Sequence, residues 1–464
     1  MKRLSPLDAS WLTVESDDTP MHVANMQIFS LPDGAAPTFL RDMVARMKAN
    51  PDVAPPWNYK LASTGFVGKT LLPRWRVDQD LDLDYHVRHS ALPKPGGERE
   101  LGVLISRLHS HPMDFKRPLW ESHIIEGLEH NRFALYTKMH HSMIDGISGM
   151  RLLQRVLSKD PDQRNMAPPW TVHPKQTLRD DEPTADARQM SRHLSEALRL
   201  QASSASALYK AISRVYAAAR NEDDALMGPF SGPLSVLNHR VTGQRRFATQ
   251  HYELERIKHL ATESNSSLND IVLYLCGTAL RRFLKEQNSL PEEPLTAGIP
   301  VNIRPADDHG TGTQISFMIA SLATNVADPL RRLEAVRAST TAAKMHLQSL
   351  PRSTLTQYTM LLMSPYILQL MTGLGGRMRP VFNVTISNVP GPDTPLYFEG
   401  ARLEAMYPVS LIAHGGALNI TCLSYAGSLN FGFTGCRETL PSMQRLAVYT
   451  GEALDELDQL LGGV

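Results

Sequence analysis

A strand-and-helix pattern that stops and then starts again is the feature that most constrains the fold of this chain. In the first part, apolar periodicity predicts strands at 22–31, 120–128 and 132–141, and helices at 37–50, 100–113 and 146–158. In the last part it predicts helices at 254–263 and 268–284, and strands at 245–254, 294–303, 316–326, 382–390, 418–425 and 428–435. The chain is therefore predicted to have a mixed α/β (α+β) fold built from two halves.

A segment rich in proline and charge separates the two halves. Residues 159–188 show no apolar periodicity, which is typical of a linker, and 189–220 predict a long helix. A chain of 464 residues also exceeds the usual size of a single core. We predict an N-terminal subdomain over 1–185, a linker and crossover helix over 186–245, and a C-terminal subdomain over 246–464.

Charge and cysteine content exclude several classes of protein. The formal net charge is +1 with 20% charged residues, so no overall field favours nucleic acid as a partner. The three cysteines, Cys276, Cys422 and Cys436, form neither a CxxC motif nor an even set, which favours a reducing, cytosolic compartment without disulfides. The start, MKRLSPLDASWL, has too few consecutive apolar residues for a signal peptide.

One long uncharged stretch runs from residue 353 to residue 376. It contains Gln357, Pro365 and Gln369, which would make a membrane-spanning helix costly. A pair of helices that lines an apolar tunnel, or that rests on a membrane surface, fits the composition better. Arg377 and Arg379 follow directly and are candidates for contact with a membrane.

The motif HHSMIDG at 140–146 is the strongest chemical signal, and it has three interpretations. A metal site is disfavoured because adjacent residues at a strand end point to opposite faces, so His140 and His141 can hardly bind one ion. A structural role, with one ring buried and hydrogen-bonded, is expected for one of the two. The third role is that of a general base.

A histidine base imposes a condition on the substrate. Imidazole has a pKa near 6.5 and a hydroxyl is weaker as an acid by about nine units, so the proton must leave while the oxygen attacks an activated carbonyl. Asp145 is expected to hold the turn by an ion pair or by hydrogen bonds to the backbone, and Gly146 to permit the turn itself.

The motif HHSMIDG resembles the HHxxxDG signature shared by CoA-dependent acyltransferases of the chloramphenicol-acetyltransferase-like fold and by condensation domains of peptide synthetases. The surrounding motifs are similar to those of the bacterial wax ester synthase/diacylglycerol acyltransferase family, in order from residue 4 to residue 432. They are LSPLDASWL, PMHVANMQIF, RPLWESHIIEGL, LNDIVLYLCGTALRRFL, PVNIR, NVPGP and YPVSLIAHGGALNITCLSYAGSLNFG.

This resemblance implies a role for residues in both halves. It implies two subdomains with an active-site tunnel at their interface, His141 as the general base, and His140 and Asp145 as residues that shape its surroundings. Pro118, Leu119 and Trp120 match the PLW motif and are predicted to support the site from beneath. Asn388 is expected to shape the tunnel wall, and Arg304 is the predicted partner of Asp145 across the two halves.

The roles of four further residues stay open at the level of sequence. Asn269 and Asp270 match the ND pair of the family, and Asn269 either caps a helix or positions substrate as an oxyanion donor, for which backbone amides near His141 are the alternative. Met360 and Met406 either line the apolar tunnel or fill the core.

The resemblance implies transfer of a fatty acyl group from acyl-CoA to a long-chain alcohol, or to diacylglycerol, without an acyl-enzyme. No metal or other cofactor is implied. Two alternatives remain: a condensation-type acyltransferase that uses a carrier-protein thioester, and a non-catalytic protein that coats lipid droplets. Because the lipids involved are insoluble in water, peripheral contact with the inner membrane or with lipid inclusions is expected.

Overall fold

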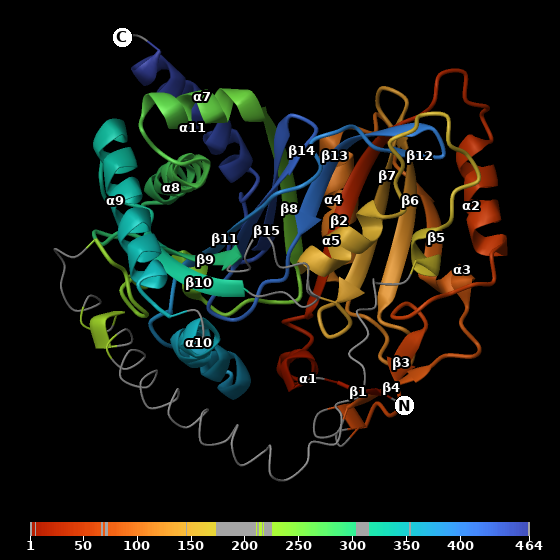
Figure 1. Cartoon of the computed structure of the whole chain (residues 1–464), viewed down its shortest axis with the longest axis horizontal. Helices are drawn as coiled ribbons and strands as arrows, with labels where there is room; N and C mark the ends of the chain where they lie inside the picture. The colour runs from red at the N-terminus through yellow and green to blue at the C-terminus, as the bar shows by residue number, and fades with distance from the viewer. Residues whose placement is uncertain are drawn as a thin grey trace.

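The computed structural model describes residues 2–4, 6–65, 68–69, 73–144, 146–172, 210, 213–215, 217, 225–302, 315–351 and 354–462. Two six-stranded sheets stand side by side in it, the first built mainly from the first half of the chain and the second from the second half (Figure 1). The predicted crossover helix at 189–220 lies almost wholly outside the described residues. Asp145, Arg304 and the first residue of the uncharged stretch also lie outside the described residues.

The first sheet carries the histidine motif. Its strand order is β12 (Tyr397–Phe398), β13 (Ala401–Val409), β2 (His22–Ser30), β7 (Arg132–His140), β6 (Trp120–Leu128) and β5 (Val87–Ala91). Helices α2 (Phe39–Ala49) and α5 (Gly146–Gln154) pack on one face, and α4 (Glu98–Ser110) packs on the other. A short helix, α3 (Leu83–His86), precedes β5.

A small third sheet lies near the N-terminus, beneath the first sheet in Figure 1. Its strand order is β1 (Lys2–Arg3), β4 (Arg74–Val77) and β3 (Tyr59–Leu61). Helix α1 (Pro6–Val14) follows β1 in the chain. Two short 3-10 turns, η2 (Pro169–Thr171) and η3 (Val236–Asn238), complete the connecting segments that the structure describes.

The second sheet has the order β10 (Ile315–Ser321), β9 (Thr296–Asn302), β11 (Val384–Val389), β14 (Leu418–Tyr425), β15 (Ser428–Cys436) and β8 (Arg245–Glu253). Its core is built around the buried helix α8 (Leu268–Glu286). The other helices of this half are α7 (Leu254–Glu263), α9 (Pro329–Gln348), α10 (Leu355–Thr372) and α11 (Arg445–Leu461).

A strand of the second half joins the first sheet and connects the two halves. β13 pairs antiparallel with β2, so residues of the predicted second subdomain, 246–464, extend the first sheet. Its side chains alternate between both cores of that sheet: Met406 joins the α2 side, and Tyr407 and Val409 join the α4 side. Sequence patterns reveal that a strand exists but do not reveal its partner, so the periodicity could not assign β13 to the first sheet.

The uncharged stretch forms one helix, and the predicted pair of helices is wrong. α10 runs through Pro365 and ends at Gly373, whose positive φ of 66° closes the helix. Tyr358, Leu362 and Met363 are buried against the second half, while the opposite side of the helix is exposed. Within the described part of the chain, no helix has both the length and the apolar character needed to cross a bilayer.

The two sheets approach each other most closely where β15 crosses β13. A Cβ on Gly432 would collide with the backbone carbonyl oxygen of Pro408. We predict that Gly432→Ala lowers the free energy of unfolding by about 1–3 kcal/mol, because backbone on both sides leaves no room to relax. Thermal and urea unfolding measure the change.

Gly416→Ala is the matched control. The nearest atom to a Cβ there is the Ala413 carbonyl oxygen at 3.9 Å, so its effect is expected within about 0.5 kcal/mol. Equal stability of the two variants would contradict the close approach of the sheets.

Candidate active site

His140 is the last residue of β7, and its ring is completely buried. The Ser142 backbone N–H donates to Nδ1 at 3.1 Å, so Nδ1 is an acceptor and the ring proton lies on Nε2. Nε2 then donates to the Glu15 carboxylate at 2.5 Å. The His140 backbone N–H donates to the Leu119 carbonyl oxygen at 2.9 Å. His140 is therefore fixed on three sides, as expected for the structural member of the pair.

His141 occupies the turn that follows and is only partly buried. Its backbone N–H donates to the Met21 carbonyl oxygen at 2.8 Å. Its ring lies against the indole of Trp11, with ring centroids 4.2 Å apart and planes inclined by 30°. The two histidines thus meet different partners, one buried and one at the edge of the site.

Helix α1 supplies contacts that the sequence interpretation missed. Trp11 of α1 stacks on His141, and Glu15, just beyond the helix, binds His140. The Glu15 carboxylate also accepts the Met21 backbone N–H at 3.0 Å. No local pattern in the sequence links Glu15 to a histidine 125 positions later.

The PLW motif lies directly beneath the pair. The Leu119 carbonyl oxygen accepts the His140 backbone N–H, and the Leu119 side chain packs with Leu12 in a small apolar cluster. Trp120 is fully buried and donates its indole N–H to the Trp57 carbonyl oxygen at 2.6 Å. Its backbone N–H donates to the Pro118 carbonyl oxygen at 2.9 Å. The motif is thus buried and hydrogen-bonded next to His140, and its supporting role in catalysis stays a prediction.

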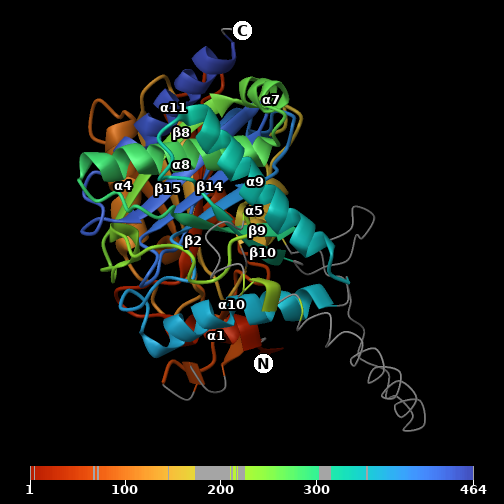
Figure 2. The same cartoon turned by 90° about the vertical axis from the view of Figure 1, so that its left-hand side faces the viewer.

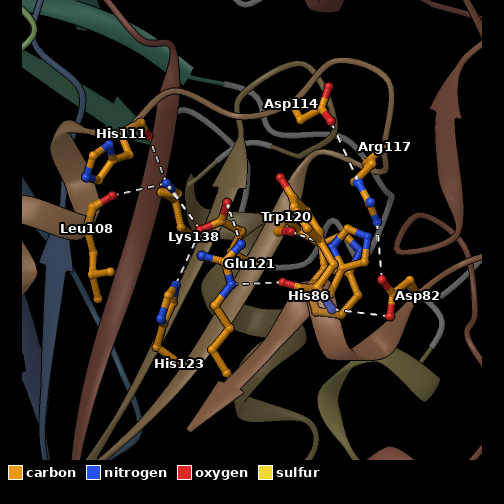
Figure 3. A network of polar contacts seen from close by, with 12 residues as sticks. Asp82, His86, Leu108, His111, Asp114, Arg117, Trp120, Glu121, His123 and Lys138 are labelled. Carbon is orange, nitrogen blue, oxygen red and sulfur yellow. Dashed lines mark hydrogen bonds and ion pairs between the residues drawn. The ribbon is translucent and has the colours of Figure 1, made fainter. Parts of the chain in front are cut away.

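A buried polar network lies under α4, on the face of the first sheet to which His140 also points (Figure 3). Lys138 donates to the carbonyl oxygens of Leu108 at 3.1 Å and His111 at 2.9 Å, and lies 3.6 Å from the Glu121 carboxylate. Burial lowers the pKa of Lys138. Burial alone would raise the pKa of Glu121, but the hydrogen bond with His123 and the charge of Lys138 bring it to about 2.

Two more buried histidines, His22 on β2 and His109 on α4, lie near this network. His22 pairs with His140 across the strands and hydrogen-bonds through Nε2 to the His109 carbonyl oxygen at 2.8 Å. His109 donates from Nε2 to the Ser410 carbonyl oxygen at 3.1 Å and accepts from the Tyr136 hydroxyl at Nδ1 at 2.8 Å. Burial lowers the pKa of His22 well below its usual value and that of His109 to about 3, so both rings are neutral.

The second half brings Asn269 and Asn388 to one cavity of about 640 Å³, which Lys344 also lines. Of the two roles left open for Asn269, that of capping α8 is excluded, because Ser267 is the N-cap and forms a capping box with Asp270. The Asp270 carboxylate accepts from the Ser267 backbone N–H at 2.8 Å and from the Thr340 hydroxyl at 2.6 Å. Asp270 is thus committed to holding the start of the helix, and Asn269 is left beside the cavity.

The remaining predicted residues are spread more widely. Met406 is fully buried in the first core, whereas the Met360 side chain is 65% exposed on α10, so the two methionines do not share one wall. Gly146 begins α5, and Asp145 and Arg304 lie outside the described residues. In the part of the chain that is described, no three His, Cys, Asp or Glu side chains are grouped to hold a metal ion.

Comparison with known proteins identifies the family. The model of the wax ester synthase/diacylglycerol acyltransferase catalytic domain matches residues 4–272, and the model of the WS/DGAT C-terminal domain matches residues 311–458. The chain belongs to this family. It is therefore an acyltransferase, as the sequence motifs predicted.

Relatives cover the whole chain. A putative diacylglycerol O-acyltransferase of Mycobacterium tuberculosis is 44% identical over 98% of this chain and 97% of its own length. The O-acyltransferase WSD of Acinetobacter baylyi is 39% identical over 100% of this chain and 98% of its own length.

Solved structures give the same result. The wax ester synthase/diacylglycerol acyltransferase of Marinobacter aquaeolei is 37% identical, covers 100% of both chains and has a TM-score of 0.80. A starter condensation domain of rhizomide synthetase has a TM-score of 0.57 at 14% identity, covering 99% of this chain and 94% of its own. That second likeness shows a shared fold, which agrees with the predicted two-subdomain architecture.

The neutral His109 makes the stability of this acyltransferase depend on pH. An unfolded histidine titrates near 6.5, whereas His109 in the folded protein titrates at about 3. Below pH 6.5 protons therefore bind the unfolded chain first, and stability falls until the pH approaches 3. We predict that His109→Gln makes the melting temperature fall less steeply between pH 6.5 and 4.

His259→Gln is the control, since this histidine is exposed on α7. It is expected to keep the slope of the unmodified protein. Thermal unfolding across the pH range measures both variants, and an unchanged slope in His109→Gln would show that another group dominates the acid response.

Proposed function

We propose that this chain transfers a fatty acyl group from acyl-CoA to a long-chain alcohol, to give a wax ester, or to diacylglycerol, to give triacylglycerol. The proposal takes its substrates from the names of the relatives and its base from the motif. The observation that carries it is the contrast within the histidine pair: His140 is fully hydrogen-bonded and buried, and His141 is partly exposed against Trp11.

In this mechanism His141 takes the proton of the acceptor hydroxyl while the oxygen attacks the thioester carbonyl. The hydroxyl is too weak an acid to ionise beforehand, so attack and proton transfer occur together. When the tetrahedral intermediate collapses, the C–S bond breaks and the imidazolium returns the proton to the CoA thiolate. No acyl-enzyme forms, and the histidine is restored in one turnover.

The partners of His141 in this mechanism are assigned by their position. Stacking on Trp11 limits the rotation of the ring and keeps bulk water from one of its faces. Asn269 is the proposed oxyanion donor, because its side chain borders the cavity together with Asn388. Asp145 and Gly146 are proposed to hold the turn, with Arg304 as the partner of Asp145. The proposed subdomains, 1–185 and 246–464, are joined by 186–245.

We predict that His141→Ala lowers turnover by about 10² to 10⁴ in a CoA-release assay with fatty alcohol as acceptor, since a positioned base contributes about that factor. The melting temperature should change little, because the ring is partly exposed. His140→Ala is the contrasting variant: it removes the partner of Glu15 and should lower stability as well as turnover. Turnover of His141→Ala close to that of the unmodified protein would exclude it as the base.

Peripheral contact with a lipid surface is proposed to occur through α10. Seven of the fourteen large apolar side chains that are exposed in the described residues lie between residues 360 and 378. They are Met360, Leu361, Ile367, Leu368, Met371, Leu374 and Met378. Such a patch on a helix without charged residues favours insertion at a membrane interface, and the exposed Arg377 beside it favours anionic headgroups.

The proposed lipid surface lies close to the histidine site. α10 contacts α1, the helix that carries Trp11, and the two helices lie together at the lower end of the molecule (Figures 1 and 2). A bound lipid surface would therefore lie beside the segment that surrounds His141. This position would shorten the path of a water-insoluble acceptor to the base.

We predict that Leu368→Glu with Met371→Glu weakens binding to vesicles containing phosphatidylglycerol by at least about tenfold, because each side chain loses apolar burial in the membrane. Leu330→Glu, at the exposed start of α9, is the control and should bind as the unmodified protein does. Vesicle flotation measures binding. Unchanged flotation of the double variant would exclude α10 as the contact surface.

A further inference from the structure

A second, larger cavity lies on the outer surface where the two halves meet. It is a groove of about 920 Å³ between α4 of the first half and β8 and α11 of the second. Its floor is fixed by two hydrogen bonds: the Ser106 hydroxyl accepts the Phe247 backbone N–H at 2.9 Å, and the Ser110 hydroxyl accepts the Arg245 backbone N–H at 2.8 Å. The groove is thus a built feature of the contact between the halves.

Besides Arg245, which donates to the backbone carbonyl oxygens of Thr242 and Asp18, four arginines line this groove, and none of the five has a carboxylate partner in the described part of the chain. Arg99 and Arg107 come from α4, Arg246 from β8, and Arg437 from the turn after β15. The Nε atom of Arg246 is buried and meets no hydrogen-bond acceptor among the described residues. The only acidic side chain on the lining, Glu98, lies 3.7 Å from Arg132, outside the groove.

Arginines without a carboxylate partner also occur elsewhere in the described residues, for example Arg281 and Arg337, so it is their number in one groove that distinguishes these. Nine other arginines lie within 4.0 Å of a carboxylate: Arg41, Arg46, Arg88, Arg117, Arg132, Arg256, Arg282, Arg379 and Arg445. Four guanidinium groups gathered in one groove repel each other unless an anion joins them. Their planar donors match phosphate oxygens in pairs, so the groove favours a ligand that carries several phosphates.

The floor of the groove adds a second requirement. Leu101, Phe247 and Ala447 are buried apolar side chains on the lining, and Val448 is exposed at its edge. A flat apolar floor with a rim of guanidinium groups suits an aromatic base attached to phosphates. It suits inorganic phosphate or a bare headgroup less well, since neither would cover the apolar surface.

We propose that this groove binds the 3′-phosphoadenosine diphosphate portion of CoA. This rests on the proposed function, because it assigns a place to the nucleotide end of the acyl donor. One end of the groove is formed by Ser110, His111 and Arg245. His111 accepts a hydrogen bond from Lys138, two residues before His140 on the same strand, and Arg245 donates to the carbonyl oxygen of Asp18 in the segment that follows Glu15.

The groove also lies away from the proposed lipid surface. α11 is at the upper end of the molecule and α10 is at the lower end in both views (Figures 1 and 2). The nucleotide of a bound acyl-CoA would therefore remain in water while α10 contacts lipid. An anionic headgroup of the same membrane would not reach the arginines in this arrangement.

The test compares two acyl donors in the full-length enzyme. Palmitoyl-CoA carries the nucleotide, and the palmitoyl thioester of pantetheine lacks it. Arg107→Gln with Arg246→Gln is expected to raise KM for palmitoyl-CoA by about tenfold or more, because charged hydrogen bonds to phosphate are lost. KM for the pantetheine thioester and kcat for both donors should not change. Arg331→Gln, on the exposed start of α9, is the control for loss of a surface arginine outside the groove.

A second measurement uses a fragment of the ligand alone. Adenosine 3′,5′-bisphosphate should compete with palmitoyl-CoA but not with the pantetheine thioester, and the double variant should weaken this competition to a similar degree. Rising salt should raise KM only for palmitoyl-CoA.

Two outcomes would overturn the proposal: an unchanged KM for palmitoyl-CoA, or an equal rise in KM for both donors. If KM is unchanged and the double variant also loses binding to anionic vesicles, the arginines are assigned to lipid headgroups instead. Transfer from the pantetheine thioester to hexadecanol tests the proposed acyl transfer separately, since it needs no nucleotide site.

Discussion

The hydrogen bond between Glu15 and His140 is the contact on which the geometry of the candidate site depends. The Glu15 carboxylate is almost completely buried, so it must find donors within the protein, and it finds them in the His140 ring and the Met21 backbone. The Met21 carbonyl oxygen then accepts the His141 backbone N–H. A single segment after α1 therefore fixes both histidines, one through its side chain and the other through its backbone.

The buried polar network extends this order from the histidine strand to the helix above it. Lys138 donates to carbonyl oxygens at the C-terminal end of α4, where a cation is favoured by the helix dipole. Glu121 balances the charge on the other side. Since Lys138 and His140 lie on the same face of β7, the position of α4 is coupled to the position of the histidine pair. The same helix forms one wall of the arginine groove, so α4 contacts both the groove and the strand that carries His140.

Much of the fold could be predicted from periodicity, because strands and helices with one buried face carry their pattern locally. β6, β14 and α7 have the predicted bounds, and the histidine motif ends its strand as expected. Partners across long distances could not be predicted in this way. Neither the contact between Glu15 and His140 nor the pairing of β13 with β2 leaves a local signal. Residue type also could not exclude Asn269 as the N-cap of α8, a position that Ser267 occupies, because both residue types favour it.

Although the net charge of the chain is close to zero, it carries a cationic surface in the arginine groove and an apolar surface on α10. A fatty acyl-CoA has the same division, with an anionic nucleotide at one end and an apolar chain at the other. An enzyme that joins such a donor to a water-insoluble acceptor needs cationic groups where the nucleotide lies and apolar side chains where the acceptor enters. If both surfaces lay together, the arginines would be drawn into the headgroup region and would bind lipid phosphates in competition with CoA. In the proposed arrangement, separation of the arginine groove from α10 removes that competition, since only α10 contacts the membrane.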